Sequence, residues 1–211
     1  MKRKKVTNPI RIAVLVSGGG TNLQALIDAE KAKKLRSGTI ALVVSNKRGA
    51  YALTRANDAG IPIALIDKAA MPSHAAFEAE LVRTLEENKI DLIVLAGFLA
   101  ILSEDFVRRY PNRIINVHPS LIPSFCGMGY YGLKVHEAAL ARGVKVTGAT
   151  VHFVNEIPDG GEIILQKSVA IHKTDTPESL QKRVMKQAEW TLLPRAAEMV
   201  SFALLQEKEE A

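Results

Sequence analysis

The chain contains 211 residues, of which 47% are hydrophobic, 24% charged and 5% aromatic. These proportions are ordinary for one globular domain with a sizeable core, and so few aromatic side chains disfavour a stacking platform for single-stranded nucleic acid. The formal net charge of +6 overstates the charge of the body, because Lys2, Arg3, Lys4 and Lys5 lie in a short basic arm. We therefore expect small anionic substrates and neither a nucleic-acid nor a membrane partner.

The number of cysteines and the lengths of the apolar runs indicate in which cellular compartment the protein is expected. Cys126 is the only cysteine, so the chain cannot form an intrachain disulfide, as is typical of proteins in a reducing compartment. The longest apolar run, at 92–102, is shorter than the ~20 residues that span a bilayer. The basic start is not followed by the apolar core of a signal peptide. We predict a cytoplasmic protein that is a monomer or a homodimer.

Apolar, β-rich segments alternate with helical patterns from residue 10 to residue 118, which is typical of a parallel α/β sheet. Strands are predicted at 10–16, 40–44, 62–66, 91–96 and 113–115. Helices are predicted between them, following Thr21, at 50–59, following Ser73 and at 98–110.

The pattern changes after Pro123. Residues 124–132 are irregular, a helix is predicted at 133–142, and strand-like runs follow at 144–154 and 163–171. The last helix should run to about residue 206, with Pro194 kinking or breaking it. These patterns predict a doubly wound, mostly parallel, Rossmann-like α/β sheet with an antiparallel C-terminal addition.

We expect one domain at 10–206, between the basic arm at 1–9 and a tail at 207–211. The first half of this domain, 10–123, carries the glycine-rich βα turn. The second half, 124–206, carries the turn around Asp159 and the C-terminal helix.

Three successive glycines, Gly18, Gly19 and Gly20, join the first strand to the first helix. Backbone N–H groups at such a helix start attract an anion, often a phosphate. Leu23 stands where the Rossmann fingerprint requires another glycine, and the Walker Gly-Lys-Ser/Thr pattern is absent. A terminal phosphate on a small substrate therefore fits better than a dinucleotide, and a plain tight turn is the alternative.

Asn116 and His118 follow a buried strand and should share one face, because side chains two residues apart on a strand point the same way. The carboxyl end of a parallel strand is where ligands bind in open α/β sheets. An amide donor and an imidazole suit acyl chemistry, since one can stabilise an oxyanion and the other can move a proton. The alternative is that both side chains only complete the turn. Asp159, on a glycine-rich turn between two strands, would raise the pKa of His118 if it lay nearby.

The other candidates have weaker support. We expect His74, His136 and His172 on exposed or helix surfaces and His152 in the core. Cys126 has no adjacent base in the sequence. No histidine or cysteine pair has the spacing of a metal site, so we expect no metal.

Four segments in order, Ser17–Ala25, Leu95–Phe98, Asn116–Pro123 and Val151–Gly161, resemble the phosphoribosylglycinamide formyltransferases. These are folate-dependent glycinamide ribonucleotide transformylases of purine synthesis. The resemblance extends from Ile10 to about Pro194. It implies transfer of a formyl group from 10-formyltetrahydrofolate to the amine of glycinamide ribonucleotide.

The resemblance also implies a role for individual residues. Catalysis is assigned to Asn116, His118 and Asp159. Binding of the ribonucleotide is assigned to Gly20, Thr21, Asn22 and Glu189. Binding of the folate is assigned to three groups of residues. These are one wall of the binding cleft, formed by Leu99, Ala100, Ile101 and Leu102, the side chain of His74, and a loop that closes over the ligand and contains Asn155 and Ile157.

Two positions and one loop depart from the family pattern. The family commonly has basic residues where His74 and Ala100 stand, and the stretch 124–132 is a few residues longer than expected.

Formyltetrahydrofolate deformylase shares the trio but usually carries an N-terminal regulatory domain, whereas only nine residues precede the first strand here. Methionyl-tRNA formyltransferase would carry a C-terminal RNA-binding domain. A non-catalytic domain that binds phosphate ligands would leave the trio unexplained.

Overall fold

In the computed structural model, the described residues 8–210 form two compact units. Residues 8–100 together with 197–210 make up the first unit, and Ile101–Ala196 make up the second. Most of the expected basic arm, residues 1–7, lies outside the described residues, as does residue 211. The chain passes between the units after residue 100 and again after residue 196. The expectation of a single domain with halves at 10–123 and 124–206 stays a prediction.

The first unit is built on parallel strands in the order β3-β2-β1-β4. The central strands are apolar and almost completely buried, as a parallel sheet covered on both faces requires. The strands are β1 (Ile10–Val16), β2 (Gly38–Ser45), β3 (Ile63–Leu65) and β4 (Leu92–Leu95).

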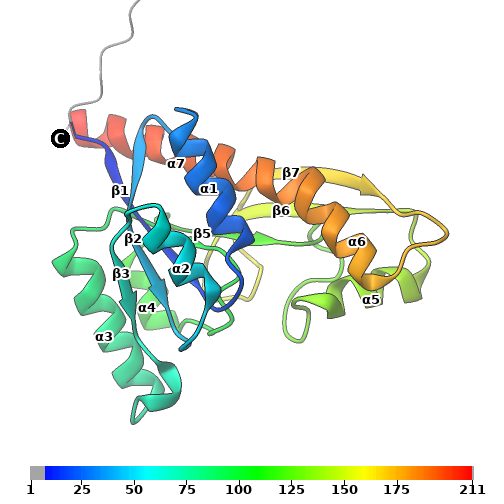
Figure 1. The fold of residues 1–211 in the computed structure, drawn as a ribbon, viewed down its shortest axis with the longest axis horizontal. Coiled ribbons are helices and arrows are strands. Elements are labelled where there is room, and N and C mark those ends of the chain that lie inside the picture. The colour runs from blue at the N-terminus through cyan, green and yellow to red at the C-terminus, as the bar shows by residue number, and fades with distance from the viewer. Residues whose placement is uncertain (1–7, 211) are drawn as a thin grey trace, which may run out of the picture. The chain divides into compact units, whose positions relative to one another are not determined.

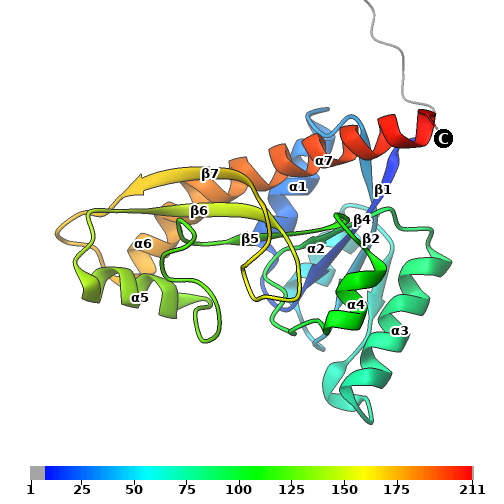
Figure 2. The same ribbon diagram turned by 180° about the vertical axis from the view of Figure 1, so that it is seen from behind.

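Helices of the first unit begin where the sequence predicts. Ser73 has an extended backbone and caps α3, because its hydroxyl accepts a hydrogen bond from the Ala76 N–H at 3.0 Å. Figures 1 and 2 show α1 and α2 on one face of β1 and β2. The helices are α1 (Thr21–Lys31), α2 (Tyr51–Asp58), a short 3₁₀ turn η1 (Lys68–Ala70) and α3 (His74–Glu87).

The second unit contains three antiparallel strands, with β6 between β5 and β7. Both views show β6 and β7 side by side (Figures 1 and 2). Its elements are α4 (Glu104–Arg109), β5 (Ile114–His118), α5 (Leu133–Arg142), β6 (Val146–Phe153), β7 (Ile163–Ala170), α6 (Pro177–Val184) and the π-helical η2 (Met185–Glu189). A parallel α/β part followed by an antiparallel addition confirms the predicted fold class.

The helix predicted at 98–110 is wrong over its first half. Residues 98–103 are not helical, and α4 begins only at Glu104. The Ser103 hydroxyl accepts from the Phe106 N–H at 3.2 Å, which caps the helix at this point. The Leu99 N–H instead donates to the Ser17 hydroxyl at 2.8 Å. Apolar spacing alone did not reveal these two side-chain contacts with the backbone.

Pro194 was predicted to kink or break the last helix, and the prediction of a break is wrong. Pro194 lies inside α7 (Trp190–Glu210), and the irregularity falls before it, in the wide π-helical turn η2. The helix continues past residue 206 to Glu210, so residues 207–210 of the expected tail are helical. Lys208 Nζ lies 2.6 Å from Asp91 Oδ1, which ties this last turn to the first unit.

Across residues 8–210, no helix combines the length and apolar character needed to span a lipid bilayer.

Candidate active site

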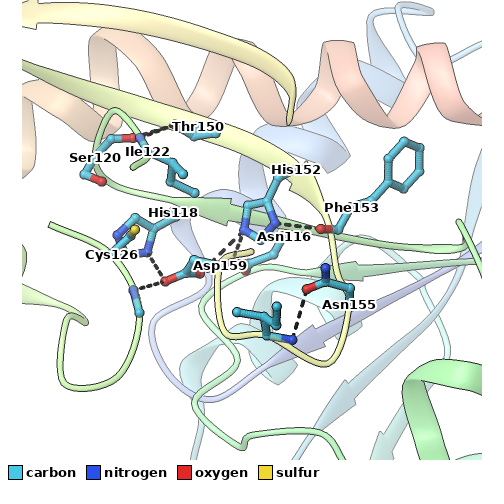
Figure 3. Close-up of polar contacts among 12 residues, drawn as sticks. Asn116, His118, Ser120, Ile122, Cys126, Thr150, His152, Phe153, Asn155 and Asp159 are labelled. Carbon is cyan, nitrogen blue, oxygen red and sulfur yellow. Dashed lines mark hydrogen bonds and ion pairs between the residues drawn. The ribbon is translucent and has the colours of Figure 1, made fainter. Parts of the chain in front are cut away.

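Four polar side chains of the second unit meet at one place (Figure 3). Asn116 and His118 extend from the same face of β5, as the two-residue spacing predicts. His152 stands opposite Asn116 in the antiparallel pair of β5 and β6. Asp159 comes from the turn between β6 and β7. We call these four residues the polar cluster.

The expected approach of Asp159 to the strand residues is present. Its Oδ2 lies 3.4 Å from His118 Nδ1, and its Oδ1 lies 3.5 Å from Asn116 Nδ2. Asp159 adopts a left-handed backbone conformation with a φ of 56°, which is uncommon for a non-glycine residue. The glycine-rich turn therefore brings the carboxylate back over the end of β5.

His152 belongs to this cluster, although its sequence position suggested only a core residue. Its Nδ1 donates to the Phe153 carbonyl at 2.7 Å, because a carbonyl oxygen can only accept. In the neutral ring Nε2 then carries the lone pair and accepts from Asn116 Nδ2 at 3.2 Å. In a protonated ring Nε2 instead carries a proton that faces Asp159 Oδ1 at 3.5 Å. Neutral His152 therefore orients the Asn116 amide. The antiparallel pairing that sets it opposite Asn116 was the signal that could have found it.

The proton affinity of His118 differs from the prediction. A nearby Asp159 was predicted to raise the pKa of His118 and so to favour the protonated imidazole. Burial, the largest influence, instead lowers the pKa of His118 below its ordinary value, and His152 adds to this lowering. The Asp159 charge and the Phe125 carbonyl raise the pKa, but they do not outweigh burial of a side chain that is 4% exposed. The resting imidazole is therefore poised to accept a proton.

Asp159 remains a carboxylate in this setting. Burial opposes its ionisation and is the largest single influence on its pKa. The contacts with His152 and His118 and the hydrogen bond from the Gly127 N–H outweigh burial and hold the pKa of Asp159 below its usual value. The cluster thus pairs a stable negative charge with an imidazole that can become positive.

The predicted glycine loop lies in the first unit. Gly20 precedes α1 with a φ of 71°, and this N-cap residue makes no side-chain hydrogen bond to the helix. Backbone N–H groups at a helix start of this kind can bind an anion. The Ser17 hydroxyl donates to Asn46 Oδ1 at 2.7 Å and fixes the start of this loop. Arg55 Nε donates to the Gly19 carbonyl at 2.8 Å, which places a cation beside it.

We expect Gly20→Ala to destabilise the protein by roughly 2 kcal/mol or more and to weaken phosphate binding. A Cβ at residue 20 would lie 2.6 Å from Ala52 Cβ, in a left-handed backbone conformation. Denaturant unfolding and calorimetric titration with phosphate would measure both effects. Gly19→Ala is the matched control, because its Cβ would meet nothing within 4 Å. Equal unfolding free energies for the two variants would contradict this prediction.

The residues expected to bind folate include exposed apolar side chains. Leu99 is 54% exposed, Ile101 58% and Ile157 60%, which is unusual for large aliphatic residues and suits contact with a flat ligand. Ala100 is buried and Leu102 is partly exposed. Asn155 Oδ1 accepts from the Ile157 N–H at 3.0 Å and shapes the turn before Asp159.

Other predicted residues vary in their environments. His74 is exposed on α3 and lies 3.2 Å from Glu78 Oε1. Thr21 is partly exposed, whereas Asn22 and Glu189 are buried. Among residues 8–210, no group of three or more His, Cys, Asp or Glu side chains is arranged to hold a metal ion.

His136 contradicts the expectation of an exposed position. It lies on α5 with 0% of its surface exposed, and neither ring nitrogen has a hydrogen-bond partner among the described residues. Burial, assisted by the nearby His118 charge, lowers the pKa of His136 to about 4. Cys126 is partly exposed, and burial raises the pKa of its thiol, which disfavours a nucleophilic role.

Comparison with known families identifies the chain. The formyl transferase pattern matches residues 10–197, which is most of the sequence. The chain belongs to the formyl transferase family. Among curated members, phosphoribosylglycinamide formyltransferase of Escherichia coli is 42% identical over 178 residues, covering 84% of this chain and 81% of that protein.

This formyl transferase also matches longer proteins. The trifunctional purine biosynthetic protein adenosine-3 of Gallus gallus is 46% identical over 200 residues, which is 95% of this chain but only 19% of that protein. The chain thus spans about a fifth of this multifunctional relative.

Solved structures agree with the family assignment and with the fold. Glycinamide ribonucleotide transformylase 1 of Symbiobacterium toebii is 41% identical with a TM-score of 0.86, covering 92% of this chain and 89% of that chain. The phosphoribosylglycinamide formyltransferase of Coxiella burnetii is 40% identical with a TM-score of 0.84, covering 93% and 89%.

Proposed function

We propose that this formyl transferase moves the formyl group of 10-formyltetrahydrofolate to the amine of glycinamide ribonucleotide. The observation that carries this proposal is the polar cluster, where the Asp159 carboxylate lies within 3.5 Å of both an amide donor and a buried imidazole. Relatives of similar length bear the name of this activity. The function is a step in purine synthesis.

The reaction needs a hydrogen-bond donor that stabilises the negative charge developing on the formyl oxygen. The substrate amine attacks the formyl carbon, and the carbonyl oxygen becomes an oxyanion in a tetrahedral intermediate. Asn116 Nδ2 donates to His152 Nε2 at 3.2 Å and makes a longer contact of 3.5 Å with Asp159 Oδ1. The hydrogen in the longer contact can turn to the oxyanion when the substrates are bound. A donor placed in this way contributes roughly 3–4 kcal/mol to stabilisation of the transition state.

The reaction also needs a path for one proton. The amine loses a proton as the new C–N bond forms, and the folate nitrogen gains one as its bond to the formyl carbon breaks. His118 can accept the first proton, because burial lowers its pKa and so favours a neutral resting ring with a free lone pair. The resulting imidazolium is stabilised by Asp159, and it later returns the proton to the departing nitrogen. The enzyme therefore ends in its starting protonation state, with no metal required.

The two substrates are assigned to separate groups of residues. Gly20, Thr21 and Asn22 of the first unit are assigned to the ribonucleotide, and so is Glu189 of the second unit. The exposed apolar side chains of Leu99, Ile101 and Ile157 contact the folate. Exposed His74 is available to the folate tail, whereas the small, buried Ala100 offers it no charge.

A formyl-transfer assay tests this function directly. With glycinamide ribonucleotide and 10-formyltetrahydrofolate, we expect formylated ribonucleotide in amounts equal to the folate consumed. Without the ribonucleotide, we expect little formate. Rapid formate release in that control would identify a deformylase, and folate binding without any turnover would identify a non-catalytic domain. The cytoplasmic location and the monomeric or dimeric state stay predictions.

A further inference from the structure

The loop after β5 contacts the polar cluster through its backbone. The Phe125 carbonyl lies 2.9 Å from His118 Nε2, and the Gly127 N–H donates to Asp159 Oδ2 at 2.8 Å. Cys126 lies between these two residues in the sequence. These residues belong to the irregular stretch 124–132 between β5 and α5. We call Phe125–Gly127 the positioning turn.

The positioning turn has an unusual backbone. Phe125 has a φ of 52° and Gly127 a φ of 85°. A bulky residue in the left-handed region costs on the order of 1–2 kcal/mol, and such strain is concentrated at functional sites. Here the left-handed conformations accompany the two backbone contacts with the cluster.

Neighbouring contacts hold the turn in place. The Ser120 hydroxyl, which is fully buried, donates to the Ser124 carbonyl at 2.6 Å. The Phe125 ring packs edge-on against Tyr130, with 6.4 Å between the ring centroids. The turn is therefore fixed at its start and along its length, as a group that positions other side chains must be.

The contact with Phe125 determines which nitrogen of His118 carries a proton. A carbonyl oxygen can only accept, so Nε2 must donate and must be protonated in the neutral ring. Nδ1 then carries the lone pair and faces Asp159 Oδ2 at 3.4 Å. When Nδ1 gains a proton, both ring nitrogens have an acceptor, and a repulsive contact becomes an ion pair.

We propose that the positioning turn assigns the proton-transfer role to one atom, His118 Nδ1. The Phe125 carbonyl keeps a proton on Nε2, and the Gly127 N–H holds Asp159 opposite Nδ1. The proton released by the amine is taken up at Nδ1, directly or through water, and is then delivered to the folate nitrogen. This inference rests on the proposed formyl transfer, and it adds Gly127 as a positioning residue.

Replacement of Gly127 tests the proposal. Gly127→Ala forces the backbone out of its left-handed conformation and moves the N–H away from Asp159. We expect kcat to fall roughly tenfold, the effect of losing one buried contact to a charged group, while KM for both substrates stays within about twofold. Gly129→Ala is the matched control: Gly129 has a φ of 90° in the same loop, and its new Cβ would meet nothing within 4 Å. We expect its kcat to stay near the wild-type value.

Nitrogen NMR of the His118 ring provides a readout that loss of packing alone would not change. In the wild type we expect Nε2 to stay protonated and Nδ1 to titrate. In Gly127→Ala we expect the pKa of His118 to fall further, because Asp159 is no longer held opposite Nδ1. His152 also lowers the pKa of His118, and His118 in turn lowers the pKa of His136. Neither is altered in this variant.

Two results would overturn the proposal. One is a Gly127→Ala variant whose kcat and His118 titration match those of Gly129→Ala. The other is a wild-type spectrum in which the resting ring carries its proton on Nδ1, and this measurement decides the question even if Gly127→Ala fails to fold. Absence of formyl transfer by the wild type would instead refute the proposed function, and the tautomer would still be measured.

Discussion

Replacing Asn116 with alanine is expected to lower kcat for formyl transfer by roughly 10²–10³-fold, the typical cost of one oxyanion donor. The loss should fall on kcat, because the donor interacts with charge that exists only in the transition state. Steady-state kinetics with both substrates would measure it. Asn57→Ala is the matched control, since Asn57 is exposed on α2 and no hydrogen bond of its side chain is described.

The same reasoning extends to the two partners of Asn116. His118→Ala removes the proton acceptor, and Asp159→Asn removes the charge that stabilises the imidazolium, so both should lower kcat. Phosphate binding at the glycine loop should survive in all three variants. Near-normal turnover in all three would remove this mechanism altogether.

The second large effect concerns stability at acid pH. His136 has a folded pKa of about 4, whereas the unfolded value is about 6.5. The unfolded chain therefore binds the proton more tightly between these values. The stabilising contribution of this residue is present above about pH 6.5 and is lost as the pH falls towards 4. The full loss is about 3 kcal/mol, from ~1.4 kcal/mol per pKa unit.

Denaturant unfolding at several pH values would measure this loss. We expect His136→Leu to lose less stability than the wild type between pH 6.5 and pH 4, because its buried side chain cannot titrate. His172→Leu is the matched control, since His172 is exposed, and its pH dependence should follow the wild type. Identical curves for the wild type and His136→Leu would contradict the prediction. His118 contributes a loss of the same sign, because burial also lowers its pKa.

His118 illustrates why a nearby carboxylate did not decide the protonation of an imidazole. Asp159 lies close enough to favour the charged ring, as the sequence predicted. Exclusion of water around the ring has the larger effect, and it favours the neutral form. For a base that must accept a proton from an amine, this balance is useful. The carboxylate stabilises the ring only after the proton has arrived.

The amino-acid sequence determined the features that depend on local spacing and chemistry. Asn116 and His118 share a face because a strand repeats every two residues. Ser73 caps α3 because its hydroxyl can reach the N–H three residues ahead. Gly20 allows the left-handed turn that begins α1. The ordered motifs also led to the correct family.

The tertiary structure decided what depends on distant segments and on the exclusion of water. Strand pairing brought His152 against Asn116, and burial made His136 an unpaired neutral residue within the described chain. The turn at Phe125 and Gly127 reached His118 and Asp159 through backbone atoms, which carry no sequence signature. Local periodicity predicts the direction of a side chain. Its proton affinity and its partners depend on which atoms surround it after folding.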